Sequence, residues 1–211
     1  MNTPTFSVII PAHNSDKYIT RLLDSIKSQS FIDYELIVVC DSCTDDTEQI
    51  ARQYTDKVYA VNFGQDGQTR NVGLEHATGK WILFADDDDW FLHEFVFRML
   101  SEVVSKHNEV DVVFFDFIWK NVGYTAQTKD NTYIACWNKC YRRDFISDCR
   151  FSNEIHSSDV QFYAQVMCKK PMGIFWNTPL YYYNFLREGS QSKELKDSGE
   201  MYQGIDIKEG D

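Results

Sequence analysis

The chain contains, at residues 81–89, the stretch WILFADDDD, in which an apolar run leads directly into four aspartates, Asp86 to Asp89. A short continuous apolar run is typical of a strand buried on both faces of a parallel sheet. Adjacent carboxylates repel one another unless a positive group lies among them. In an extended segment, side chains alternate, so Asp86 and Asp88 point one way while Asp87 and Asp89 point the other.

Two interpretations of the aspartate run remain open from these residues. Asp86 and Asp88 together suit a hard divalent cation such as Mg²⁺ or Mn²⁺, which prefers oxygen ligands and often binds substrate phosphates as well. Alternatively, the run is a solvated acidic turn that caps the next helix, because carboxylates favour a helix N-terminus.

Apolar runs and helical spacing alternate on either side of this stretch. This pattern predicts an α/β fold, with a mostly parallel sheet that has helices on both faces. The predicted strands of the first half lie at residues 6–10, 35–39, 58–61, 81–85 and 112–117. After residue 120, we expect a loop or hairpin at 121–132, a strand-like piece at 137–141, helices at 142–148 and 158–168, and short strands at 174–175 and 180–183.

Polar residues follow three of the predicted strands. They are Pro11 to Asn14, Asp41, and Asp86 to Asp89. Ligands of parallel sheets bind beyond the carboxyl ends of the strands. The sequence therefore predicts a binding site at this edge.

The composition limits the classes of function. The chain has 211 residues, 43% of them hydrophobic, and a formal net charge of −11. The acidic charge argues against nonspecific nucleic acid binding and against a polybasic membrane anchor. No apolar stretch approaches the roughly 20 residues that span a bilayer. We identify no signal peptide before the first strand and expect a cytoplasmic protein.

The six cysteines are expected to be reduced thiols in that compartment. Cys40 with Cys43 and Cys136 with Cys140 suggest a zinc site, but the second pair has a poor spacing and neither lies in a recognisable knuckle. Cys40 ends an apolar run, and we expect it to be a small buried hydrophobe.

Several motifs in order resemble family-2 glycosyltransferases with a GT-A fold. The motifs in the first half are residues 7–14, 39–45, 70–73 and 84–89. Residues 137–143, 158–159 and 183–192 resemble the continuation in bacterial cell-surface polysaccharide transferases. The resemblance implies a single domain over residues 1–211, with a nucleotide-sugar-binding half at about 1–118, an acceptor-binding half at about 119–192 and a polar tail at 193–211.

The resemblance also implies roles for individual residues. Asp86 and Asp88 would hold a Mg²⁺ or Mn²⁺ ion that neutralises charge on the departing nucleoside diphosphate. Asp41 would accept a hydrogen bond from the base, unless it only caps the next turn. Arg70 would lie near the diphosphate, unless it forms a surface ion pair with the aspartate run. The residues implied in donor binding are Pro11, Asn14, Asp41, Arg70, Asp86, Asp87 and Arg187, the last in a loop with Ser190 and Ser192 that would close over the diphosphate.

Asp159 lies where the family places a catalytic base, which would take a proton from the acceptor hydroxyl. One base and direct displacement imply inversion at the sugar carbon. Ser158 departs from the family, which commonly has a Glu there; Glu154 is a candidate substitute. The alternative is that Asp159 only caps a helix.

Four further side chains and one histidine are weaker candidates. Lys139 and Arg142 lie near the expected acceptor side and would contact substrate phosphates. Trp90 and Trp137 would stack on sugar faces. His156 is either an additional metal ligand or a solvated loop residue.

These expectations describe a metal-dependent inverting transferase that uses a nucleoside-diphosphate sugar, most simply a UDP-sugar. The acceptor would be a saccharide, free or lipid-linked, in surface polysaccharide synthesis. The resemblance leaves open a peripheral association with the inner membrane face and a homodimer. Two other classes remain: a sugar-nucleotide-binding module without catalysis, and a nucleotidyltransferase, which would need a glycine-rich and basic loop after the first strand.

Overall fold

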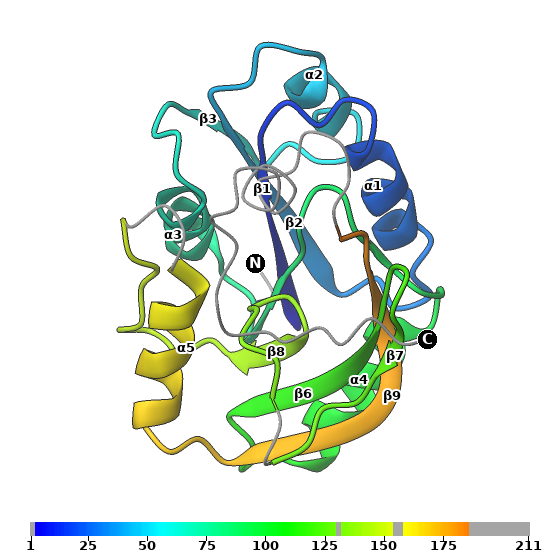
Figure 1. The fold of residues 1–211 in the computed structure, drawn as a ribbon, viewed down its shortest axis with the longest axis vertical. Helices are drawn as coiled ribbons and strands as arrows, with labels where there is room; N and C mark the ends of the chain where they lie inside the picture. The colour runs from blue at the N-terminus through cyan, green and yellow to red at the C-terminus, as the bar shows by residue number, and fades with distance from the viewer. Residues whose placement is uncertain (1–2, 130–131, 154–157, 186–211) are drawn as a thin grey trace.

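The computed structural model describes residues 3–129, 132–153 and 158–185. A single sheet of nine strands runs through this part of the chain (Figure 1). Its order is β3 (Val58–Val61), β2 (Tyr34–Asp41), β1 (Phe6–Ala12), β4 (Trp81–Phe84), β8 (Lys139–Arg142), β6 (Val112–Trp119), β9 (Gly173–Tyr183) and β5 (Trp90–Phe91), with β7 (Gly123–Thr125) paired to β6.

The strands of the first half form the parallel part of the sheet, as the alternating pattern predicts. Strand β1 pairs in parallel with β2 and β4, and β2 pairs in parallel with β3. All four therefore end at the same edge, which carries Asp41 as the last residue of β2 and Asp86 just after β4. This part of the α/β prediction is confirmed.

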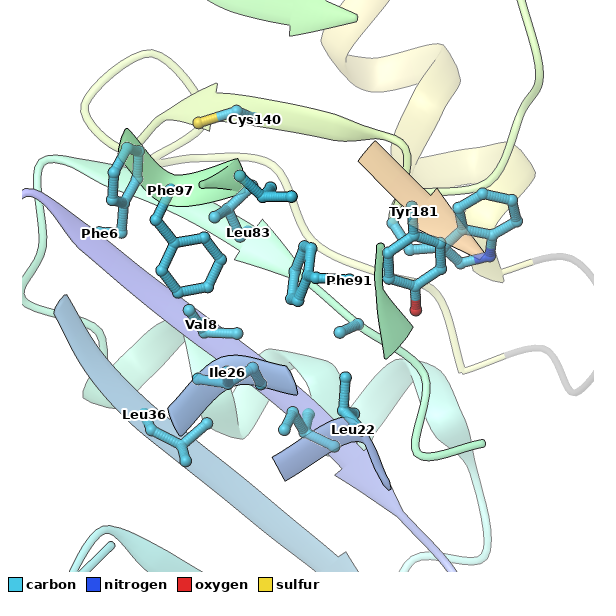
Figure 2. Packing of buried hydrophobic residues seen from close by; sticks show 14 of the residues in the cluster. Phe6, Val8, Leu22, Ile26, Leu36, Leu83, Phe91, Phe97, Cys140 and Tyr181 are labelled. Carbon is cyan, nitrogen blue, oxygen red and sulfur yellow. The ribbon is translucent and has the colours of Figure 1, made fainter. Parts of the chain in front are cut away.

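Alternate side chains of the central strands enter two separate cores. The first core packs Phe6, Val8 and Ile10 against α1 (Ile19–Lys27) and α4 (Val96–Lys106) (Figure 2). The second packs Ile9 and its neighbours against α3 (Asp66–His76) and α5 (Ser158–Cys168). Helix α2 (Thr47–Ala51) adds to the first core. Helices thus cover both faces, which fixes the sheet between them and holds its edge in place.

The second half of the chain differs from the prediction in two respects. Residues 174–175 and 180–183 belong to one strand, β9, because it pairs with β6 through a register shift near Asp116. Residues 143–148 form turns rather than a helix, since Arg143 donates its backbone N–H to Lys80 O instead of to a helical acceptor.

Within the loop or hairpin expected at 121–132, residues 123–125 form β7 and pair with the end of β6, so this part is a hairpin. The cysteines of the described residues are free thiols, and Cys40 is 1% exposed at the end of β2, as expected for a small buried hydrophobe. None of the described helices has the length and apolar character that crossing a membrane requires.

Glu35, at the start of β2, ties several segments together. Its carboxylate accepts hydrogen bonds from Ser7 Oγ in β1, from the backbone N–H groups of Thr78 and Gly79 before β4, and from Lys57 Nζ before β3. Burial raises the pKa of Glu35, but these donors outweigh burial and bring the pKa to about 2. The carboxylate form therefore stabilises the fold.

We expect Glu35→Gln to lower the free energy of unfolding at pH 7 by about 2 kcal/mol, which is less than the full pKa shift implies because Lys57 is partly exposed. The pKa of Glu35 is lower in the folded than in the unfolded chain, so this stabilisation is present above about pH 4.3 and is lost as the pH falls toward 2. Urea unfolding should show that the difference in the free energy of unfolding between the wild type and Glu35→Gln is about half as large at pH 3 as at pH 7. Glu109→Gln, at an exposed position, is the control. A stability difference between the wild type and Glu35→Gln that does not change with pH would contradict the prediction.

Candidate functional site

The loops that follow β1 and β2 are tied to one another at the carboxyl edge. His13 Nδ1 lies 2.6 Å from Asp41 O, and Asn14 Oδ1 accepts the Thr44 N–H at 2.8 Å. Asn14 has a φ of 45°, a left-handed conformation that asparagine tolerates better than most residues. Its side chain is exposed at the edge, whereas Pro11 is buried within β1.

Asp41 is 4% exposed, and both of its oxygens accept hydrogen bonds from the protein. Oδ1 accepts from the backbone N–H groups of Phe63 and Gly64, and Oδ2 accepts from the Gln65 N–H and Thr69 Oγ1, at 2.8–3.0 Å. Burial raises the pKa of Asp41, but the backbone donors outweigh it and lower the pKa below the usual range. Asp41 thus holds the loop that leads into α3, and its contact with a nucleotide base stays a prediction.

Asp41→Asn should test the two roles of this residue separately. An amide places an NH₂ group against some of these donors, so we expect the free energy of unfolding to fall by about 2–4 kcal/mol without any ligand. Thermal unfolding of the ligand-free protein gives the measurement. If Asp41 serves only to bind the base, the ligand-free variant will have the same Tm as the wild type, and only its nucleotide binding will be weakened.

The exposure of the four aspartates alternates as expected, but the segment is a turn rather than an extended chain, since Asp87 and Asp88 lie in a turn and the Asp89 N–H donates to Asp86 O at 3.1 Å. Asp86 and Asp88 are partly exposed, whereas Asp87 is 8% exposed and Asp89 is 0% exposed. Asp87 Oδ2 accepts the His13 N–H at 3.0 Å, and Asp89 Oδ1 accepts the Asn184 N–H at 2.7 Å. The inward pair therefore fixes neighbouring segments, and the outward pair presents hard oxygen atoms to the edge.

Arg70, on α3, lies among three carboxylates. Its guanidinium is 2.7 Å from Asp86 Oδ1, and 3.9 Å from both Asp66 Oδ2 and Asp159 Oδ1. The Arg70 side chain is only 6% exposed, and the Asp86 side chain is 26% exposed. The expected alternative of an ion pair with the aspartate run is therefore present, but it is buried rather than on the surface.

Asp159 is the second residue of α5, and Arg70 brings it into the same cluster as Asp86. Burial raises the pKa of the Asp159 carboxyl, Arg70 opposes that rise, and Asp86 adds to it. A raised pKa suits a general base that operates near neutral pH. The neighbouring Ser158 is 8% exposed and packs close to Gly67 of α3, so it does not face the edge as Asp159 does.

Three other side chains that were expected to contact substrate are occupied by contacts within the protein. Arg142 pairs with Asp111 and lies opposite Trp81, at the far end of β4 from Asp86. Trp90 stacks on Tyr182 at 4.0 Å, with the Arg21 guanidinium 3.2 Å from the centre of its ring. Trp137 is 2% exposed and stacks on Tyr181 in the core. The expected contacts of these three residues with substrate are therefore not supported.

Lys139 is also turned away from the substrate edge, at 1% exposure. Its ammonium group donates to Tyr133 O, Ala135 O and Asn138 Oδ1 at 2.5–2.7 Å. Burial lowers the pKa of Lys139 to about 7. Lys139 holds residues 133–138 in place and has no donor left for a substrate phosphate.

Lys139→Met should reduce the free energy of unfolding by about 3 kcal/mol, because three buried oxygen atoms lose their donor. Chemical denaturation of the variant, with the exposed Lys106→Met as control, gives the measurement. Equal stability of the two variants would show that the buried ammonium is dispensable.

Arg187, Ser190, Ser192, Glu154 and His156 lie outside the described residues. Within the described part of the chain, no group of three or more His, Cys, Asp or Glu side chains is placed to hold a metal ion. This result gives no support to a zinc site. A cation on Asp86 and Asp88 would therefore need further oxygen ligands from a diphosphate or from water.

Residues that the sequence analysis did not single out complete the site. Tyr181 OH accepts the Asp86 N–H at 3.0 Å, and Thr69 Oγ1 donates to Asp41. Asn184 donates to Asp89 and to Asp88 O. The tyrosine run at 181–183 was a visible signal, but only the pairing of β5 with β9 shows which tyrosine reaches the aspartates.

The fold matches that of solved glycosyltransferases. The structure of Staphylococcus aureus TarS 1–349 in complex with UDP-GlcNAc aligns with a TM-score of 0.78 and 28% identity, over 90% of this chain and 60% of that chain. PcManGT from Pyrobaculum calidifontis, a mannosyltransferase in complex with GDP-Man and Mn²⁺, aligns with a TM-score of 0.71 over 93% of this chain and 61% of that one. Its identity of 15% makes this a likeness of fold alone.

The chain thus has the GT-A fold of these glycosyltransferases. The chain belongs to glycosyl transferase family 2, whose model matches residues 7–171.

Two bacterial relatives show how much of a longer protein this chain matches. The poly(ribitol-phosphate) beta-N-acetylglucosaminyltransferase TarS of Staphylococcus aureus is 39% identical over 113 residues, which is 50% of this chain and 20% of TarS. The putative glycosyltransferase EpsH of Bacillus subtilis is 29% identical over 216 residues, which is 87% of this chain and 61% of EpsH. The chain therefore spans less than two thirds of the length of either relative.

Proposed function

We propose that this chain transfers a sugar from a nucleoside-diphosphate sugar, most simply a UDP-sugar, to a hydroxyl group of a saccharide acceptor in surface polysaccharide synthesis. The observation that carries the proposal is the clustering of Asp86 and Asp159 around Arg70 at the carboxyl edge of the sheet. The UDP-GlcNAc bound by TarS, which has the same fold, supports a uridine donor.

Asp86 and Asp88 are the residues that would hold Mg²⁺ or Mn²⁺. They fit such an ion because both supply partly exposed carboxylate oxygens, whereas their neighbours Asp87 and Asp89 turn inward. A bound cation supplies neutralisation of charge on the diphosphate leaving group. The carboxylates themselves position the donor relative to the edge.

Asp159 would accept the proton of the acceptor hydroxyl while that oxygen attacks the anomeric carbon and the bond to the diphosphate breaks. Direct attack with one base inverts the configuration at that carbon. Asp159 Oδ1 has no hydrogen-bond partner among the described residues, and its ion pair with Arg70 is long, at 3.9 Å. A lipid-linked acceptor would bring the enzyme to the cytoplasmic face of the membrane.

Release of UDP from UDP-GlcNAc, and from a panel of other nucleotide sugars, tests the proposal in the presence of Mn²⁺ or of EDTA. We expect Asp159→Asn to lower kcat by about 10²–10⁴-fold while donor binding is retained. Asp86→Asn should weaken donor binding only when Mn²⁺ is present. The control is Asp144→Asn, whose side chain is 90% exposed in the wild type.

Two results would separate this proposal from its alternatives. Donor binding without turnover for every sugar nucleotide, unchanged in Asp159→Asn, would favour a binding module, which the serine at position 158 keeps open. Full turnover in EDTA would remove the cation from the proposal. Family membership already favours transfer of a sugar over transfer of a nucleotidyl group.

A further inference from the structure

Arg70 occupies a position that its expected role at a diphosphate does not explain. Its guanidinium contacts protein carboxylates, at 2.7 Å from Asp86 and 3.9 Å from Asp66 and Asp159. Because the side chain is 6% exposed, these are contacts of a desolvated charge rather than of a surface ion pair. Arg70 therefore serves as the counter-charge of the acidic edge.

The shortest of these contacts is to a residue that is also a predicted cation ligand. Asp86 Oδ1 is held by Arg70, and its backbone N–H is held by Tyr181 OH at 3.0 Å. A carboxylate oxygen that binds a guanidinium tightly cannot bind a cation with the same lone pairs, and the two positive charges repel at such a short separation. Arg70 and a cation thus compete for the charge of one carboxylate, whichever Asp86 oxygen the cation binds.

We propose that Arg70 is a positioning residue that neutralises Asp86 in the cation-free protein and sets the affinity of the site for a divalent cation. The proposal rests on the proposed function only in taking Asp86 and Asp88 as the cation ligands.

A second partner is available when Arg70 leaves Asp86. The Arg70 guanidinium is 3.9 Å from Asp159 Oδ1, a buried atom without a hydrogen-bond partner among the described residues, and Arg70 Nε lacks a partner in the same part of the chain. A rotation of the guanidinium toward α5 would bring it within hydrogen-bond distance of Asp159 Oδ1. Release of Asp86 would therefore strengthen the contact between Arg70 and Asp159, so that the cation site and the base site are filled in concert.

Binding of Mn²⁺ alone, without nucleotide, tests this proposal in wild type, Arg70→Met and Arg70→Lys. We expect Arg70→Met to melt at least about 5 °C lower in EDTA, because three carboxylates lose their counter-charge, and to recover with Mn²⁺. Removal of the competitor should tighten Mn²⁺ binding by about tenfold or more, measured by calorimetry or by the loss of the free-Mn²⁺ spectroscopic signal. Arg70→Lys should fall between the two.

Arg98→Met on α4 is the matched control, since Arg98 is 64% exposed and pairs only with Glu102 one turn away among the described residues. It should leave both the Tm and Mn²⁺ binding unchanged. Mn²⁺ binding by Arg70→Met that is equal to or weaker than that of the wild type would overturn the proposal. Absence of Mn²⁺ binding in every variant would overturn it as well.

UDP release measured on the same preparations keeps the two proposals apart. Mn²⁺-dependent release by the wild type, together with unchanged Mn²⁺ affinity in Arg70→Met, would overturn the role of Arg70 and leave the proposed transferase intact. No release from any donor, together with tighter Mn²⁺ binding in Arg70→Met, would overturn the proposed transferase and leave the role of Arg70 intact.

Discussion

The arrangement of the acidic edge depends on one buried guanidinium. Carboxylates from α3, from the end of β4 and from α5 converge on Arg70, and like charges this close would repel without it. Burial makes the interaction strong and also makes its loss costly, because each charge has given up water. The position of α5 relative to the central strands is therefore linked to the same charge pairs that define the site.

The loops after β1 and β2 are organised by a different device. Asp41 gathers backbone donors from residues 63–65, while Asn14 and His13 tie the first loop to the second. These bonds use short polar side chains at strand ends, where the backbone of parallel strands has no further ladder to join. The result is a rigid rim on which exposed groups such as the Asn14 side chain can meet a ligand.

Local pattern was sufficient to predict the parallel half of the sheet and the alternation of the aspartates. Continuous apolar runs mark β1, β2 and β4. The expected placement of Asp86 outward and Asp87 inward is found, although a turn rather than an extended chain produces it. The motifs also indicated the family that the comparison later showed. Residues 154–157 and 186–211 carry further predicted side chains, and those stay predictions.

What local pattern could not predict depends on partners distant in the sequence. Nothing near Lys139 indicates that three oxygen atoms surround its ammonium group, or near Trp90 that Tyr182 and Arg21 cover its ring. Arg70 was placed near the correct carboxylates, but its burial follows from the packing of α5 against α3. Such features arise from tertiary contacts, which override the preferences of a single residue type.

The antiparallel strand β8 has a consequence for how this chain can be divided. It lies between β4 and β6 and pairs with both, so a segment from the second half of the chain completes the sheet of the first half. A fragment ending near residue 118 would leave the hydrogen-bonding edge of β4 unpaired, beside the uncovered side chains of Leu83 and Phe84. Other copies of such a fragment would add their strands to this edge, and the fragment would aggregate. The two halves of the chain therefore depend on each other to fold and cannot be exchanged separately.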